Sequence, residues 1–317
     1  MKTLIIYYSQ TGNTKTIAEA IHRGMSEASD QCDLVDIRDI DPRSLRGYDI
    51  VGIGSPAIGA EADIVKRFIY RIPYTGGQHA FAFNTHGSLP KEYFPSAVRR
   101  LQEREFTVIG FKGWFANVHI QSFPVPYYTD GHPDEIDIKE AEDFGRELVD
   151  RSKRIWAGEH DLIPTAPDFP PPKPHKLTYG GVVDAPGVHG DRQYDQSKCL
   201  YPKCRICMDN CPEEFIDFSK EPREFGSRKN ECTINECCYC ELLCPSGAIY
   251  ITDEDLEYAH NFLKGAHAFF EATLNEYEAT GEFRRKVPVD NVGWDTMYND
   301  VNSKRPRVKP PGRCKKI

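Results

Sequence analysis

The sequence has no long apolar run. Hydrophobic residues make up 39% of its 317 residues, and no stretch approaches the roughly 18 apolar residues that a membrane-spanning helix needs. The first segment, Met1 to Tyr8, is too short for a secretory signal and runs directly into a polar motif. We therefore expect a cytoplasmic protein without a membrane span.

Two nucleotide-binding motifs and an excess of positive charge are also missing. Neither G-x-G-x-x-G nor G-x4-G-K-S/T occurs, so neither motif favours NAD(P) or ATP. The formal net charge is −8, which argues against nucleic acid as a partner. The charge is uneven, because no acid follows Asp300 whereas seven basic residues do. We interpret this basic end as a wrapping or disordered tail, or as a docking arm for an acidic partner.

Nine of the eleven cysteines gather between Cys199 and Cys244. They form two runs that both read C-x4-C-x2-C-x3-C-P, plus Cys238, and the second run lies 33 residues after the first at each matching cysteine and proline. A fixed offset carried by several positions indicates an internal duplication. In a cytoplasmic chain such clustering indicates metal binding rather than a disulfide framework.

The cysteine spacing favours iron–sulfur clusters over two alternatives. Structural zinc sites usually take paired C-x2-C knuckles that lie well apart, and neither zinc nor disulfides explains why C-x3-C-P occurs twice. Residues 190–253 resemble the bacterial two-cluster ferredoxin family, whose run is C-x2-C-x2-C-x3-C-P and whose last cysteine ligates the other cluster. The first spacing departs from that family, since x4 replaces x2 in both runs.

Carried over by position, the resemblance implies two [4Fe–4S] clusters with crossed ligands. One cluster would be held by Cys199, Cys204, Cys207 and Cys244, and the other by Cys211, Cys232, Cys237 and Cys240. Cys238 remains, either as a buried small hydrophobic residue or as an alternative ligand.

The first half of the chain begins with a pattern typical of anion binding. Leu4 to Tyr8 is a continuous apolar run, as expected for a strand that is covered on both faces. The polar stretch Ser9 to Thr14 follows, and then Ile17, Ile21 and Met25 recur with helical spacing. A strand, a short polar loop and a helix start together favour a phosphate, because backbone N–H groups and the helix dipole point at it.

Strands and helices then alternate, which predicts an α/β fold with a doubly wound parallel sheet. In such sheets ligands bind beyond the carboxyl ends of the strands, so residues 9–14, 55–59 and 84–88 should meet. The expected strands are residues 4–8, 33–37, 48–54, 79–83 and 107–111, and the expected later helices are residues 64–72, 90–103 and 136–156.

Residues 1–157 resemble the flavodoxin family through Ser9-x-Thr11-Gly12-Asn13-Thr14 directly after the first strand. The resemblance implies a five-stranded parallel sheet that binds FMN. By position the phosphate would be held by Ser9, Gln10, Thr11, Gly12, Asn13 and Thr14, and the ring would be flanked by Ser55, Pro56, Ala57, Ile58, Gly59, Asn84, Thr85, His86 and Gly87. Neither ring-flanking segment contains Trp or Tyr, unlike many flavodoxins. The alternative is the same fold without FMN, and His86 is either a hydrogen-bonding loop residue or a group that tunes the flavin.

We expect five segments along the chain. A flavodoxin-like domain over residues 1–157 precedes a proline-rich linker over 158–189 and a small α+β ferredoxin-like two-cluster domain over 190–253. The apolar runs after each Cys-Pro, residues 215–218 and 248–251, would each form a strand of a small duplicated sheet. A helix over 254–281, with Asp253 as its N-cap, and an extended basic tail over 282–317 complete the chain.

These features predict an electron-transfer flavoprotein that passes electrons between FMN and two [4Fe–4S] clusters and serves a partner oxidoreductase in an anaerobic metabolism. It would act as an electron carrier or as an oxidoreductase component. The alternatives are a self-sufficient FMN-dependent reductase of a small molecule and a regulator that uses its clusters as a sensor. The aromatic loop 121–133 either covers the flavin or packs on the surface.

Overall fold

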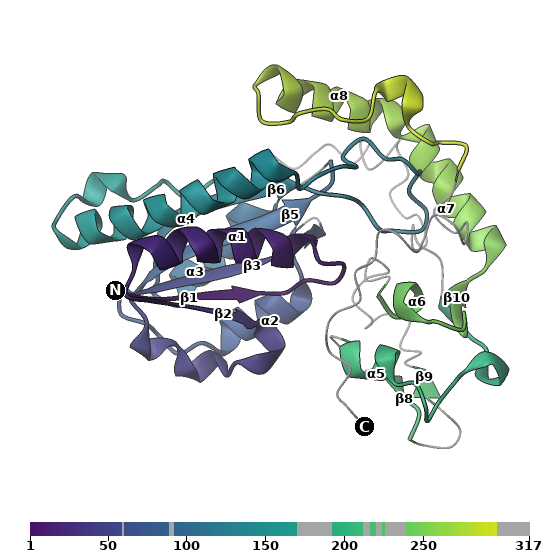
Figure 1. Ribbon diagram of the computed structural model, residues 1–317, viewed down its shortest axis with the longest axis horizontal. Coiled ribbons are helices and arrows are strands. Elements are labelled where there is room, and N and C mark those ends of the chain that lie inside the picture. Colours follow the sequence, from purple (N-terminus) through teal and green to yellow (C-terminus); the bar gives the residue numbers. More distant parts are fainter. Residues whose placement is uncertain are drawn as a thin grey trace. The chain divides into compact units, whose positions relative to one another are not determined.

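The chain divides into two compact units in the computed structural model (Figure 1). The first unit comprises Met1–Asn117 and Gly131–Pro171, and the second comprises Val118–Asp130 and Pro172–Ile317. A short segment from within the first half therefore belongs to the second unit, which the sequence did not predict. The structure describes residues 1–58, 60–88, 92–169, 192–211, 216–219, 224–225 and 239–296.

The first unit is a parallel sheet between two layers of helices (Figure 1). The strand order is β2-β1-β3-β5-β6, and all four neighbouring pairs are parallel, which confirms the predicted doubly wound fold. The strands are β1 Lys2–Tyr7, β2 Gln31–Asp36, β3 Ile50–Ile58, β5 His79–His86 and β6 Thr107–Phe115, with the short β4 Ala60–Glu61 antiparallel to β3. The helices are α1 Asn13–Ala28, α2 Asp63–Arg71, α3 Tyr93–Glu103 and α4 Glu135–Trp156.

Both faces of the sheet are buried. Alternate residues of β5 point to opposite cores: Ala80 and Ala82 pack with α2 and α3, whereas Phe81 and Phe83 pack with α1 and α4. On the second face α1 and α4 approach backbone to backbone, because a Cβ on Gly145 would lie only 2.4 Å from the carbonyl oxygen of Ile21. This close approach leaves no room for a side chain at position 145.

Three strands extend further than the sequence indicated. β3 reaches Ile58, β5 reaches His86 and β6 reaches Phe115, so segments expected as loops are strand ends. The apolar runs stop earlier, but the parallel ladder continues through small polar residues, since Ser55 pairs with Asn84. The helix expected from residue 90 begins at Tyr93.

The second unit contains a duplicated pair of short helices. α5 Ile206–Asn210 and α6 Tyr239–Leu243 are offset by 33 residues at both ends, as the cysteine runs are. β7 Arg192–Tyr194 pairs with β10 Ile249–Ile251, and β8 Ile216–Asp217 pairs with β9 Glu224–Phe225, both antiparallel. Both apolar runs contain a strand, as expected, but β8 and β10 lie in two separate two-stranded sheets rather than in one.

The segment expected as one helix over residues 254–281 forms two helices. They are α7 Asp253–Gly265 and α8 His267–Ala279. Thr252, rather than Asp253, is the N-cap of α7, because its Oγ1 accepts the N–H of Asp255. No helix among the described residues is long and apolar enough to cross a membrane.

Residues 118–130 pack within the second unit. The rings of Phe123 and Tyr127 lie 6.3 and 6.5 Å from that of Phe270 in α8, and the indole N–H of Trp294 donates to the hydroxyl of Tyr128 at 3.4 Å. The aromatic loop is thus well packed.

Short 3-10 helices span Ile37–Asp39, Pro42–Gly47, His160–Leu162, Gln196–Lys198 and Val289–Asn291. Residues 170–189 of the expected linker over 158–189 and residues 297–317 of the expected tail over 282–317 lie outside the described residues.

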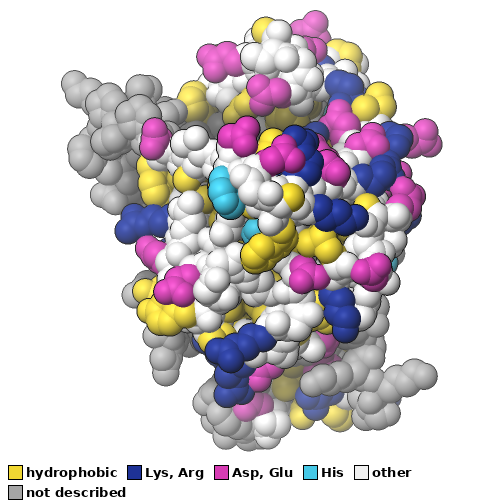
Figure 2. All heavy atoms as spheres, turned by 90° about the vertical axis from the view of Figure 1, so that its left-hand side faces the viewer, with side chains coloured by type: hydrophobic (Ala, Val, Ile, Leu, Met, Phe, Trp, Pro, Cys, Tyr) yellow, Lys and Arg dark blue, Asp and Glu magenta, His cyan; other side chains and the backbone are white. Residues whose placement is uncertain are grey.

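Charges of both signs are mixed on the face of the molecule shown in Figure 2. That face carries no large patch of basic side chains of the kind that binds nucleic acid (Figure 2). Exposed ion pairs such as Lys139–Asp143, at 2.9 Å, are common in the first unit. Exposed pairs contribute little to stability because solvent screens them, so the apolar cores rather than these pairs stabilise the unit.

Candidate functional site

The loop between β1 and α1 presents an open helix N-terminus. Gly12 is the N-cap with a φ of 100°, a conformation that favours glycine, and no side chain caps the helix there. The Oγ of Ser9 accepts the N–H of Gly12 at 3.2 Å, which tightens the loop. No acid occupies the first turn. Backbone N–H groups and the positive end of the helix dipole therefore favour an anion at this place.

Three of the predicted phosphate residues, Gln10, Asn13 and Thr14, form hydrogen bonds within the protein. The hydroxyls of Thr14 and Thr85 form a hydrogen bond of 2.7 Å, and both side chains are buried. The amide of Asn13 donates to the carbonyl of Asn117 at 3.0 Å. Gln10 donates to the Tyr8 hydroxyl at 3.1 Å. Thr11 is partly exposed, and no described residue engages its hydroxyl. The Oγ of Ser9 only accepts, so the hydroxyls of Ser9 and Thr11 and the backbone N–H groups remain the available donors.

Ser55, at the end of β3, belongs to a buried hydrogen-bond chain. Its N–H donates to the Tyr93 hydroxyl at 3.0 Å, and that hydroxyl donates to the carbonyl of Phe83 at 2.8 Å. Burial raises the pKa of Tyr93. Pro56 and Ala57 are partly exposed beyond this chain. Ala57 pairs with Glu61 and Ile58 with Ala60, so β3 folds back at once on β4, while Gly59 lies outside the described residues.

The end of β5 places Asn84, Thr85 and His86 directly beside the end of β3. Asn84 is fully buried, and neither the oxygen nor the nitrogen of its side-chain amide has a hydrogen-bond partner among the described residues. Nδ1 of His86 donates to the carbonyl of Gly87 at 2.8 Å. Burial lowers the pKa of His86 to about 4, so the imidazole is neutral at physiological pH. Gly87 is partly exposed.

The three predicted segments thus meet at the carboxyl ends of the neighbouring strands β1, β3 and β5. The side chains of Ser55, Asn84 and Thr85 are covered by protein. A ligand at this edge would therefore meet backbone groups of the strand ends rather than these three side chains. Tyr93 and Asn117 support the strand ends and were not predicted, although Asn117, like Asn84, directly follows an apolar strand segment.

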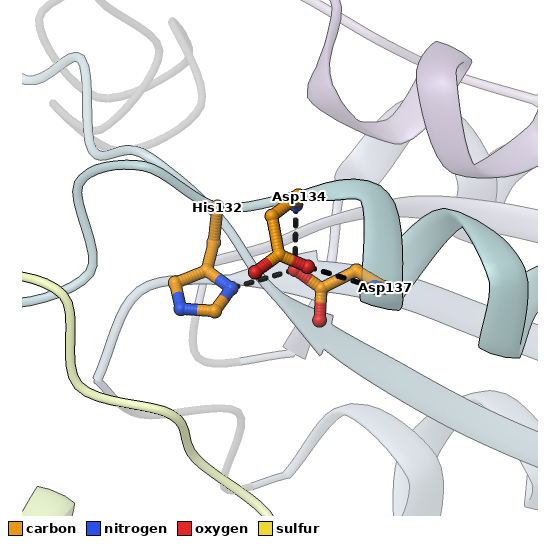
Figure 3. A group of neighbouring side chains, drawn as sticks. All are labelled: His132, Asp134 and Asp137. Carbon is orange, nitrogen blue, oxygen red and sulfur yellow. Dashed lines mark hydrogen bonds and ion pairs between the residues drawn. The ribbon is translucent and has the colours of Figure 1, made fainter.

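A His–Asp–Asp group near Asn117 serves the start of α4 (Figure 3). Nδ1 of His132 donates to Asp137 at 2.6 Å, and the N–H of Asp134 donates to the same carboxylate at 2.7 Å. Asp134 in turn accepts the N–H of Asp137 at 2.9 Å, which completes a capping box. These bonds give each carboxylate a structural role, so we assign the group to helix capping rather than to a metal.

A second site lies in the second unit, where four cysteines line one pocket. They are Cys199, Cys204 and Cys207 from the first run and Cys244 from the second. Apolar side chains complete the lining, including Tyr194, Phe218 and Ile249. The rings of Tyr194 and Phe218 are stacked at 4.7 Å. Four thiols that converge in an apolar pocket can hold a metal centre away from water.

The surroundings of Cys207 disfavour an uncompensated thiolate. Burial, and then the nearby thiols of Cys244, Cys204 and Cys199, raise the pKa of Cys207 to about 12. A thiolate there would be unstable unless a metal ion offset its charge. None of the seven described cysteines forms a disulfide. Cys211 and Cys240 do not line this pocket, and Cys232, Cys237 and Cys238 lie outside the described residues.

A buried ion pair ties the two halves of the cysteine region together. Arg192 in β7 lies 3.1 Å from Glu241 in α6, and their side chains are 7% and 0% exposed. Removal of one partner would leave a buried charge, which typically costs about 3–5 kcal/mol. The pair therefore fixes α6, which carries Cys240 and precedes Cys244, against the strand before the first run.

Comparison with known proteins shows which family the first unit resembles. The family model described as Flavodoxin matches residues 5–111. The N-terminal half is a flavodoxin-like domain. An uncharacterised protein of Methanocaldococcus jannaschii is 29% identical over 156 residues, which cover 47% of this chain and 99% of that protein. A flavodoxin of Megasphaera elsdenii is 27% identical over 110 residues, which cover 33% of this chain and 80% of the flavodoxin.

A third relative is named as a ferredoxin. An uncharacterised ferredoxin of Methanocaldococcus jannaschii is 33% identical over 60 residues, which cover 19% of this chain and 92% of the ferredoxin. The chain is therefore similar to a flavodoxin and to a ferredoxin, and it is longer than the stretch that either of them matches.

Proposed function

We propose that this chain is an electron-transfer flavoprotein that carries FMN and two [4Fe–4S] clusters and exchanges electrons with a partner redox protein. The proposal joins the flavodoxin-like domain to the cysteine region. The observation that carries it is the pocket in which Cys199, Cys204 and Cys207 meet Cys244. These are the four residues that a crossed two-cluster arrangement requires for its first cluster.

The duplication supports a second cluster. The short helices α5 and α6 repeat at the same offset as the cysteines, and their neighbouring strands exchange between halves. The same exchange brings Cys244 to the first run, so by symmetry it would bring Cys211 to the second. Cys211 lies outside the first pocket, which agrees with that assignment.

The open N-terminus of α1 supports FMN in the flavodoxin-like domain. Its backbone N–H groups, Ser9 and Thr11 would hold the phosphate. The end of β3, up to Ile58, and the end of β5, with Gly87 directly after it, would flank the ring with backbone groups. His86 would stay neutral beside the ring because it is buried.

FMN accepts one or two electrons and a [4Fe–4S] cluster passes one at a time, so together they couple two-electron and one-electron chemistry. The protein holds these groups and excludes water. Tyr194, Phe218 and Ile249 cover the first cysteine pocket with apolar surface, which controls solvent access to whatever the thiolates hold.

Anaerobic purification with iron, acid-labile sulfide and flavin analysis tests the proposal. We expect about eight iron atoms and one FMN per chain. Four iron atoms per chain would refute the two-cluster assignment, and zinc in place of iron would refute the clusters altogether.

Cysteine variants test the crossed ligands. Cys211→Ser should perturb only the cluster held by the second run, and Cys244→Ser only that held by the first, as seen by two distinct low-temperature EPR signals. Cys32→Ser is the matched control, because Cys32 lies in β2 of the other unit. Loss of the first cluster alone in Cys211→Ser would contradict the crossing.

A further inference from the structure

The loop that carries Cys199 and Cys204 has an exposed surface of mixed apolar and basic character. Leu200 lines the cysteine pocket and is nevertheless 51% exposed. Pro202 and Lys203 follow it and are also exposed. A large apolar side chain that reaches from a buried site to solvent offers a short path between that site and a partner, and such side chains often mark interfaces.

Basic side chains surround Leu200. Lys198, 57% exposed, lies 3.4 Å from Asp195 and 5.6 Å from the ring centre of Tyr250. Arg205 lies 3.4 Å from Asp209, whose carboxylate is only 11% exposed. Within the described part of the chain Lys203 has no ion pair. Solvent therefore meets mostly positive charge here.

The duplicated loop shows that the cysteine spacing does not demand this charge. In the second run, 33 residues later, Glu231 stands where the first run has Lys198, and Glu236 stands where it has Lys203. Thr233 stands in the place of Leu200. The ligand spacing is the same in both loops, so the basic and apolar residues of the first loop serve something other than ligand geometry.

We propose that residues 198–205, here called the first-loop surface, dock an acidic one-electron redox protein. This inference rests on the proposed function, since it takes the first cysteine pocket as the place where electrons leave or arrive. The chain has a net charge of −8, so an acidic partner would be repelled by most of it. A local positive surface at the pocket would orient such a partner and raise its association rate.

The binding test uses lysine protection in the intact, anaerobically purified protein. The probe is a 20-residue polyglutamate peptide, and acetylation of each lysine is measured by mass spectrometry at low salt. We expect protection at Lys198 and Lys203, lost in about 0.5 M NaCl. Protection confined to the basic residues after Asp300 would overturn the proposal, because the tail would then be the acidic-partner site.

The electron-transfer test compares the rates at which an anionic and a cationic oxidant react, which report the charge around the first cysteine pocket. Protein is reduced with dithionite, freed of excess reductant and mixed with ferric-EDTA, an anion, or with hexaamminecobalt(III), a cation. Each reduced cluster loses one electron, fully reduced FMN loses two, and each metal complex gains one; the rate is read from the cluster absorbance. Lys203→Glu, which copies the residue of the second loop, should slow the anion and speed the cation about two- to fourfold at low salt. Lys2→Glu, in the first unit, is the matched charge control and should change neither rate.

The outcomes separate the two proposals. Protein without iron would refute the proposed function, whatever the lysine protection. Full iron content together with equal effects of Lys203→Glu and Lys2→Glu, or with no protection at Lys203, would refute the first-loop surface alone.

Discussion

Replacement of Thr14 tests how the loop after β1 is joined to the sheet. Its hydroxyl and that of Thr85 lie 2.7 Å apart, and the two residues are only 1% and 3% exposed. Thr14→Val keeps the shape but leaves the Thr85 hydroxyl buried without its partner. Loss of the bond and the unpaired hydroxyl together should lower the free energy of unfolding by about 1–3 kcal/mol. Thr85→Val should cost a similar amount.

The double variant supplies the decisive comparison. With both hydroxyls replaced by methyl groups no polar group is stranded, so Thr14→Val/Thr85→Val should cost less than the sum of the single changes by about 1–2 kcal/mol. Hydrogen exchange of β5 peptides, followed by mass spectrometry, measures the opening free energy of the first unit alone. Additive effects would refute the buried pair.

The same variants distinguish two roles in phosphate binding. If Thr14 serves the sheet, Thr14→Val should change FMN affinity little beyond its effect on stability. Thr11→Val should instead weaken FMN binding without a loss of stability, since no described residue engages the Thr11 hydroxyl. The reverse pattern in titrations of flavin fluorescence would show that the Thr14 hydroxyl leaves Thr85 for the phosphate.

Two further predictions concern packing and pH. Gly145→Ala should lower the free energy of unfolding, measured in urea, by about 1–3 kcal/mol, because its Cβ would lie 2.4 Å from the backbone of Ile21. Gly265→Ala is the control: no atom lies within 4 Å of its Cβ, so it should be neutral or stabilising by up to about 1 kcal/mol. Equal effects of the two changes would contradict the close contact between α1 and α4. The folded pKa of His86 is lowered from 6.5 to about 4, so below pH 6.5 the unfolded chain binds a proton that the folded protein does not. The contribution of His86 to stability should therefore be full above pH 6.5 and fall by up to about 3 kcal/mol towards pH 4. Unfolding measured at several pH values gives the dependence of the unfolding free energy on pH, and this dependence should be weaker in His86→Gln. An unchanged dependence would contradict a neutral buried imidazole.

The sequence predicted the architecture of the first unit because burial on both faces leaves a strong signal. Leu4 to Tyr8 and the alternating helices and strands require a parallel sheet, and the sheet has that form. Strand ends were harder to predict. Ser55 and Asn84 interrupt the apolar pattern, yet their pairing extends the ladder. Hydrogen bonding between strands is set by the neighbours and is therefore invisible in a single segment.

The residues around the strand ends show a second limit of prediction from the sequence. The motif Ser9 to Thr14 indicated an anion loop, and the open start of α1 has that character. The inward turn of Thr14 towards Thr85 depends on a residue 71 positions away. Tyr93, which links Ser55 to Phe83, gave no sequence signal beyond that of an aromatic residue in a helix. Such partners depend on tertiary packing, which local spacing does not encode.

The cysteine region shows why repeated spacing carried more information than local propensity. Its short strands, of two or three residues, have almost no sequence signal, and β8 and β10 do not share one sheet as expected. Each small sheet instead takes one strand from each half of the duplication. Neither half can therefore pair its strands alone, and the first cysteine pocket likewise needs Cys244 from the second half. The exchanged strands and the shared cysteine pocket both follow from the interlocking of the two duplicated halves, so the halves must fold together. They must do so even though their two cysteine loops carry opposite charges at matching positions.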